Sequence, residues 1–477
     1  MHNTKLILLL KSFSSKDMKS LREFVRSPYF NKNKNVISLF DYLKKFHPRF
    51  DSEKLSDELV FRNVFGKDKF DYHKLKNISS DLLAAVKKFL VSEGIEEKTH
   101  LKNKILLEQY RSRAQDSLFK QLYKNVVSEN ESKTVKDEFY FYAMLDLSEE
   151  LKSFYSPKEP NSHFELFQEQ LDNLLEYALI RFLRLYNTML HENKQNNFKY
   201  KFNMFDEVFN FIKNRDNQHN PTLLMYYYII LLETNGKEQF FFKLKELFES
   251  HYDEFSMYDK YMYYLHMGGF CADMYNFQCR TDFMKEHFLL SAENFEKGTI
   301  ELGKIMYLDF MNYVKIAVRV NEFGWAEDYI NCFKDKLTEE KDNTLNFCYA
   351  YIEFKKNNLD KALELFSRVN FSNFIVKIQL KLILLQIYYE KGFYELAINH
   401  IDSFRHYLKR ESDIQDGFKD SFYNFLKIVN EMIRQKTNLN KDGNHFFSIN
   451  IKNEITLVKT NHFGLKLWLF EKAEEFK

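Results

Sequence analysis

With 477 residues, the chain is long enough for about three ordinary domains or for one continuous array of repeats. Its 5 Pro and 12 Gly are too few for a sheet built on many tight turns, while 45% hydrophobic and 29% charged residues favour amphipathic helices. The net charge of +2 is unevenly spread, since residues 1–130 hold 26 Lys and Arg against 16 Asp and Glu and the remainder holds 44 against 52.

The apolar runs are too short for a membrane span. The run Leu6–Leu10 lacks the length and the cleavage site of a secretion signal, and the ten residues of Leu223–Leu232 fall short of the about 20 that a bilayer requires. The cysteines form no CxxC, and their aromatic neighbours predict buried thiols in a reducing compartment. They are Cys271, Cys279, Cys332 and Cys348. We therefore expect a cytoplasmic protein with no membrane span.

Residues 1–130 are predicted to form a basic, compact helical region. Its best-defined helix begins at Ser14 or Ser15 and runs to about Val25, and further helices are predicted at 36–46, 56–65, 71–91 and 100–127. At 100° per residue, four basic side chains lie opposite the apolar face of that first helix. They are Lys16, Lys19, Arg22 and Arg26. This basic face is a possible partner-binding surface, and a solvated helix surface is the simpler interpretation.

Part of this region resembles a known family. The run Ser27-Pro28-Tyr29-Phe30-Asn31-Lys32, and then Phe70-Asp71-Tyr72-His73-Lys74-Leu75, resemble the N-terminal region of a family of uncharacterised proteins from Bacteroidetes. The resemblance supports a boundary for an N-terminal region and implies no biochemical activity.

Two prolines make residues 152–162 the best linker candidate. We therefore expect a helix and linker over 131–160, and an α-solenoid with a C-terminal capping helix over 161–477. Helices are predicted throughout this part, at 161–192, 200–213, 221–234, 237–252, 257–278, 282–297, 300–322, 325–337, 418–434 and 464–476. The segment 449–458 is ambiguous, because its alternating pattern also fits a strand or a hairpin.

The stretch Asn346–Leu408 contains two helix pairs in similar register. Ala362 and Ala397 are 35 residues apart, and a period of about 34 residues is typical of stacked helical hairpins. Both alanines are predicted to be buried where two helices cross. Nine residues of the two units match the tetratricopeptide pattern, namely Ala350, Leu359, Ala362 and Phe366, then Leu384, Tyr388, Gly392, Tyr394 and Ala397.

A weaker third unit lies near Trp325, with Asp328 at the position usually filled by alanine. The two clear units resemble tetratricopeptide repeats, although neither begins with the usual Trp and no Pro ends the helix pairs. The resemblance implies an all-α fold of helical hairpins forming a tetratricopeptide-like α-solenoid. Such repeats often bind peptide segments on a concave face.

No catalytic, cofactor or metal motif is found, since GxxxxGK[ST], GxGxxG, HExxH and GxSxG are all absent. His251, His266 and His287, with two Cys between them, are too widely spaced for zinc and are interpreted as core. Gly268-Gly269 predicts either a close approach of two helices or a break. Aromatic clusters at 225–228, 240–242 and 258–264 are interpreted as core rather than as platforms for nucleic-acid bases, with some Tyr left to line a groove.

These observations favour a non-enzymatic scaffold that binds a partner protein or peptide on a helical-repeat groove and needs no cofactor. The second hypothesis is a nucleic-acid-binding or regulatory protein that uses the basic N-terminal region, with the repeats as a platform for dimerisation or regulation. Nucleic-acid binding is not favoured, because Lys far outnumbers Arg in this region and Arg is the commoner reader of bases and phosphates. An enzyme whose site carries no recognisable motif is the third.

Overall fold

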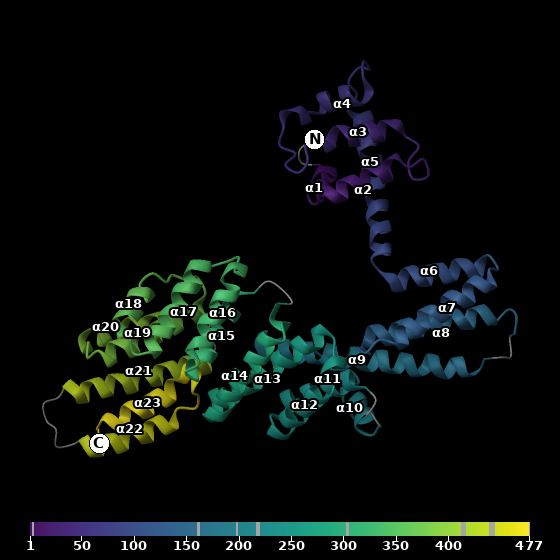
Figure 1. The fold of residues 1–477 in the computed structure, drawn as a ribbon. Helices are drawn as coiled ribbons and strands as arrows, with labels where there is room; N and C mark the ends of the chain where they lie inside the picture. Colours follow the sequence, from purple (N-terminus) through teal and green to yellow (C-terminus); the bar gives the residue numbers. More distant parts are fainter. Residues whose placement is uncertain are drawn as a thin grey trace. The chain divides into compact units, whose positions relative to one another are not determined.

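The structure is a computed structural model that describes residues 1, 4–159, 163–196, 199–215, 220–301, 305–411, 416–437 and 444–476. Within these residues the chain forms α-helices and short 3-10 turns and no strand, so the predicted all-α class is confirmed (Figure 1). Backbone contacts divide the chain into two compact units. Unit 1 comprises residues 1–132 and 142–173, and unit 2 comprises residues 133–141 and 174–477.

This division differs from the predicted boundaries at residues 130 and 160. Most of the segment 131–160 is the helix α8 (Glu138–Tyr155), and α9 (Glu165–Asn196) begins soon after it. Both helices contribute residues to both units. Residues 156–159 and 163–164, which lie between these helices, belong to unit 1, and residues 160–162 of the predicted linker lie outside the described residues.

Unit 1 begins with a five-helix bundle. The Ser14 hydroxyl accepts a hydrogen bond from the Asp17 backbone N–H, and the Asp17 carboxylate accepts one from the Ser14 N–H, which fixes the predicted start of α2. The helix predicted over 71–91 is the longest of the bundle and continues past Gly94 to Glu96. The bundle consists of α1 (Lys5–Lys11), α2 (Ser15–Arg26), α3 (Lys34–Lys44), α4 (Asp57–Phe65) and α5 (Tyr72–Glu96).

The predicted single helix over 100–127 is wrong. The chain forms α6 (Thr99–Ser112) and α7 (Asp116–Glu131), because Ala114 takes a left-handed conformation with φ of 51° between them. Asp146 on α8 accepts hydrogen bonds from His100 and Lys104 on α6, over 2.9 and 2.7 Å. These bonds join α6 to α8 within unit 1.

The first half of unit 2 is packed largely with aromatic side chains. Tyr226, Phe241 and Tyr263 are buried, and Tyr263 stacks on Phe248 with ring centroids 3.5 Å apart. The aromatic clusters therefore serve mainly as core, as predicted. After α9 this half contains α10 (Phe205–Lys213), α11 (Pro221–Asn235), α12 (Glu238–Ser250), α13 (Met257–Gln278) and α14 (Thr281–Glu296).

Three helical hairpins follow. They are α15 (Tyr307–Arg319) with α16 (Phe323–Phe333), α17 (Lys341–Lys355) with α18 (Leu359–Phe366), and α19 (Phe374–Glu390) with α20 (Tyr394–Arg410). Each turns at a left-handed residue, namely Asn321, Asn357 or Gly392, with φ of 67°, 63° and 71°. The next N–H then reaches the carbonyl five residues back, over 3.0, 2.9 and 2.9 Å. The same corner thus recurs after 36 and then 35 residues.

The second helix of each hairpin buries an alanine five residues after this corner. Ala326, Ala362 and Ala397 are all 0% exposed, so the predicted burial of the last two is confirmed. The assignment of Asp328 to the alanine position is wrong, because the corner at Asn321 places Ala326 there and leaves Asp328 exposed.

The chain ends in α21 (Asp416–Thr437), α22 (Asn444–Leu457) and α23 (Leu465–Ala473). The strand or hairpin allowed for 449–458 is wrong, because Ile451, Ile455 and Val458 are buried at helical spacing while Ile449 is exposed. On α23, Trp468 and Lys472 donate to the Glu390 carboxylate on α19, over 3.0 and 2.9 Å. The last helix therefore packs on the final hairpin.

Candidate functional site

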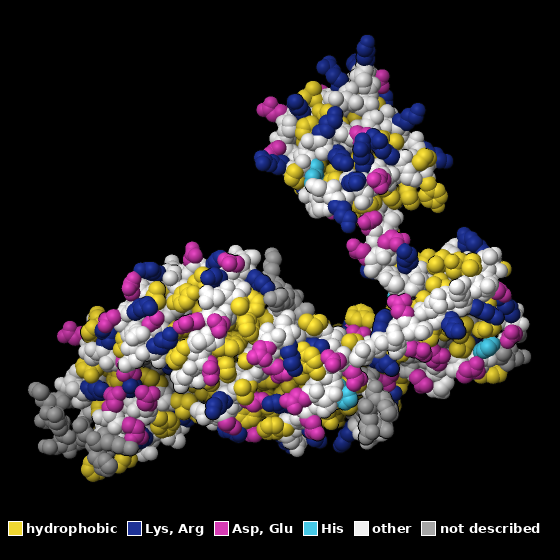
Figure 2. Space-filling view, in the orientation of Figure 1, with side chains coloured by type: hydrophobic (Ala, Val, Ile, Leu, Met, Phe, Trp, Pro, Cys, Tyr) yellow, Lys and Arg dark blue, Asp and Glu magenta, His cyan; other side chains and the backbone are white. Residues whose placement is uncertain are grey.

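The four residues of the basic face all lie exposed on α2. Arg22 and Arg26 both donate to the Asp41 carboxylate on α3, over 3.2 and 2.7 Å. Lys16 and Lys19 form no ion pair with any residue of the described ranges. Figure 2 shows Lys and Arg side chains over much of the visible face of the N-terminal bundle. The basic face is thus partly neutralised within its own bundle.

The nine repeat positions contribute to packing and corners rather than to one open site. Gly392 is exposed and provides the left-handed corner. Four of the positions are buried, namely Ala350, Ala362, Phe366 and Ala397. Four are partly buried, namely Leu359, Leu384, Tyr388 and Tyr394.

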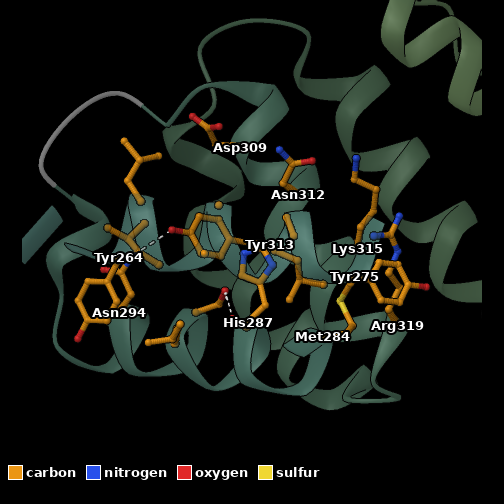
Figure 3. A pocket seen from close by; sticks show the side chains of 18 of the residues that line it. Tyr264, Tyr275, Met284, His287, Asn294, Asp309, Asn312, Tyr313, Lys315 and Arg319 are labelled. Carbon is orange, nitrogen blue, oxygen red and sulfur yellow. Dashed lines mark hydrogen bonds between the residues drawn. The ribbon is translucent and has the colours of Figure 1, made fainter. Parts of the chain in front are cut away.

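A cavity of about 730 Å³ lies within unit 2, lined mainly by α13, α14 and α15 (Figure 3). Its volume is typical of pockets that hold small ligands. Five tyrosines line it, as the sequence predicted for part of the Tyr excess. They are Tyr258, Tyr261, Tyr264, Tyr275 and Tyr313.

The segment before α23 contributes to the same cavity from far along the chain. The buried Asn461 donates its backbone N–H to the Asn276 carbonyl over 2.5 Å, and its Nδ2 to the Tyr275 carbonyl over 3.4 Å. These bonds hold the segment against α13. His462 and Phe463 thereby become part of the cavity lining.

Two cations lie one helical turn apart on α15, in the wall of this cavity. Lys315 is 8% exposed, and its Nζ donates to Gln379 Oε1 over 3.1 Å. Arg319 donates through Nε to Tyr351 Oη over 3.4 Å and lies 5.7 Å from the centroid of the Tyr275 ring. Neither cation forms an ion pair with a carboxylate in the part of the chain that the structure describes.

Burial, and next the positive charge of Arg319, lower the pKa of Lys315 from 10.5 to about 7. Burial also opposes the charge of Arg319, but Tyr351 and Tyr275 raise its pKa above the usual value. In turn, burial raises the pKa of Tyr351, and the charge of Arg319 more than offsets this, so that the pKa is lowered. This end of the cavity is therefore electropositive.

Among the described lining residues, Asp309 is the only carboxylate. It precedes Lys315 by six residues and Arg319 by ten, about 9 and 15 Å along the helix axis. Figure 3 shows it toward the other end of α15. Asp309 therefore does not neutralise the two cations at close range.

His287 on α14 lies against Gly268 on α13. A Cβ at Gly268 would be 2.9 Å from His287 Nε2, whereas a Cβ at Gly269 would meet nothing within 4 Å. The close helix approach predicted at this Gly pair is confirmed at Gly268. Burial, and then the charge of Arg319, lower the pKa of His287 to about 4, so the ring is neutral at pH 7. Its Nδ1 has no hydrogen-bond partner among the described residues.

The other His and Cys residues singled out in the sequence do not assemble into a site. His266 contacts Glu233 and Asn187, over 2.6 and 2.9 Å. No group of three metal-binding side chains occurs in the described ranges. Cys332 is exposed, so its predicted burial is wrong, because it points away from the face of α16 that buries Ile330.

A second buried polar cluster joins α8, α9, α11 and α13. The Asp259 carboxylate accepts hydrogen bonds from Arg184, from Tyr226 over 2.8 Å and from Ser256 over 2.6 Å. Arg184 also pairs with Glu138. Arg181 lies 3.7 Å from the same Glu138 carboxylate, so two guanidinium groups face two carboxylates. Because these charges compensate each other, we interpret this cluster as structural.

The sequence did not predict Lys315 or Arg319 as site residues. One sequence signal for this site was present, since Lys315 interrupts the apolar run Val314–Val318.

No protein-family model, curated protein or solved structure matches the chain. None of the described helices has the length and apolar character required to cross a bilayer. The fold and the site thus define an all-helical protein with a cavity lined by tyrosines and cations.

Proposed function

We propose that the protein is a non-enzymatic interaction scaffold, and that unit 2 binds a peptide segment of a partner protein. The cavity between α13, α14 and α15 carries this proposal. Its volume of about 730 Å³ can accept one or two side chains, and its tyrosines combine large apolar area with a polar tip. Tyrosine is enriched at protein–protein interfaces for this reason.

The three hairpins support a tetratricopeptide-like solenoid as the framework of this scaffold. Their corners recur at intervals of 36 and 35 residues, with a buried alanine at the same position after each. Repeats near this length stack by burying a continuous core between neighbours and leave one extended surface for binding. The cavity lies beside α15, which is the first helix of the first hairpin.

Binding can be tested by selecting random peptides displayed on phage against the full chain. Gly269→Phe is the informative variant, because Gly269 lines the cavity and a side chain there meets open space. Gly324→Phe is the matched control, since Gly324 lies in α16, has equal room and does not line the cavity.

The selected peptides should bind the wild type and Gly324→Phe with similar Kd, and bind Gly269→Phe at least tenfold more weakly. Failure to enrich any peptide, or equal binding by all three proteins, would refute the proposal. Circular dichroism of the two variants checks that both retain the helical fold.

Nucleic-acid binding by unit 1 is the weaker candidate. The exposed Lys16 and Lys19 favour it, because cations close to phosphates release counterions on binding. The pairing of Arg22 and Arg26 with Asp41 weighs against it. Only the two lysines of this face would be available without breaking an ion pair.

A further inference from the structure

We propose that the cavity recognises a carboxylate of the bound peptide, either an acidic side chain or a chain end, between Lys315 and Arg319. This inference rests on the proposed function, because it specifies the chemistry of the peptide that the scaffold takes.

The first argument is the missing counter-charge. A cation buried without an anionic partner is costly, and Lys315 has only the neutral Gln379 as its hydrogen-bond partner in the described chain. Among the described residues, Arg319 uses only Nε in a hydrogen bond, which it donates to the Tyr351 hydroxyl. Its two Nη groups therefore remain available for the bidentate contact that guanidinium makes with carboxylate.

The second argument is that the two cations are held in position before a ligand arrives. Tyr275 lies against the Arg319 guanidinium, and Tyr351 accepts from its Nε. Gln379, which belongs to α19, holds the Lys315 ammonium. A site whose donors are already oriented loses less conformational entropy on binding.

The third argument favours a single carboxylate over a polyanion. Residues 131–477 hold 44 Lys and Arg against 52 Asp and Glu, a net charge of −8, which repels nucleic acid and other extended anions. Asp309 adds a negative charge toward the other end of the cavity. Two cations surrounded by tyrosines can bind a single carboxylate on a ligand that is otherwise uncharged. An acidic residue beside an aromatic one in a peptide has this chemistry.

The test uses two small probes of nearly equal shape, N-acetylphenylalanine and N-acetylphenylalaninamide. The first carries a carboxylate and the second a neutral amide. Their Kd values for the full chain are measured by ligand-observed NMR at pH 6. The carboxylate should bind the wild type at least tenfold more tightly than the amide.

This preference should disappear in Arg319→Gln and in Lys315→Met, while the binding of the amide stays unchanged. Lys16→Met, at an exposed lysine of unit 1, is the matched control and should retain the full preference. Thermal unfolding of each variant shows whether it is folded.

Equal binding of the two probes, no binding of either at millimolar concentration, or a preference that survives in Arg319→Gln would overturn the inference. The outcome is separable from that of the peptide selection. A carboxylate preference without any enriched peptide would retain the anion site and reject the peptide scaffold. Enriched peptides that bind equally well after their acidic groups are amidated would retain the peptide scaffold and reject the anion site.

Discussion

Replacing Lys315 with Met should stabilise unit 2 at pH 6 by about 2–4 kcal/mol. The pKa of Lys315 falls from 10.5 to about 7 on folding, and each pKa unit corresponds to about 1.4 kcal/mol, so burial of the protonated amine costs about 5 kcal/mol. Met retains the apolar stem and removes the charge. Against this gain, Gln379 Oε1 loses its donor, which costs about 1–3 kcal/mol.

The gain should depend on pH in a defined direction. Between pH 7 and 10.5 the unfolded chain holds the Lys315 proton and the folded chain does not, so the contribution of Lys315 to wild-type stability rises with pH in this window. The advantage of Lys315→Met is therefore complete below pH 7 and declines above it. It should fall by about 3 kcal/mol between pH 6 and pH 9.

Urea unfolding followed by Trp fluorescence measures this effect, because Trp325 and Trp468 are the only 2 Trp of the chain and both lie in unit 2. Lys285→Met, at an exposed lysine on α14, is the control and should change stability by less than about 0.5 kcal/mol at either pH. A Lys315→Met variant that is less stable than the wild type at pH 6, or equally stabilised at pH 6 and pH 9, would show that Lys315 is not a costly buried amine.

Three further predictions concern packing and charge. Ala362→Leu should lower the free energy of unfolding by about 1–3 kcal/mol through overpacking, whereas the exposed Asp328→Leu should change it by less than about 0.5 kcal/mol. Urea unfolding midpoints that rank the two variants in the opposite order would show that the repeat register is wrong. Gly268→Ala should destabilise the folded protein, because the added methyl group contacts the His287 ring, while Gly269→Ala should stabilise it by up to about 1 kcal/mol through helix propensity. Thermal unfolding of the two variants measures this difference. The full chain should bind mixed-sequence duplex DNA with a Kd above about 1 μM at about 150 mM salt; tighter binding, lost when the basic face is neutralised, would make nucleic acid the leading partner.

The sequence predicted the features that depend on near neighbours. The start of α2 follows from the Ser14–Asp17 pair, and the hairpin period follows from apolar residues spaced within single helices. The break at Ala114 was missed because a left-handed alanine carries no composition signal.

The cavity could not be predicted in the same way. Its wall combines α13, α14 and α15 with Gln379 and with Phe463, which are brought together only by tertiary packing. Lys315 stands out as a lone cation in an apolar run, but the run itself does not reveal whether the amine is buried or what it faces. The large number of tyrosines indicated that some of them line a groove, but it did not show which ones.

The docking of Asn461 on α13 has a consequence for the way unit 2 unfolds. Contacts in an open helical array are confined to neighbouring repeats, so such an array can unravel progressively from an end. Here a buried side chain bonds to a helix 186 residues away in sequence. The terminal helices cannot detach without exposing α13 and one wall of the cavity. We therefore expect unit 2 to unfold in one cooperative transition rather than by progressive fraying from its C-terminal end.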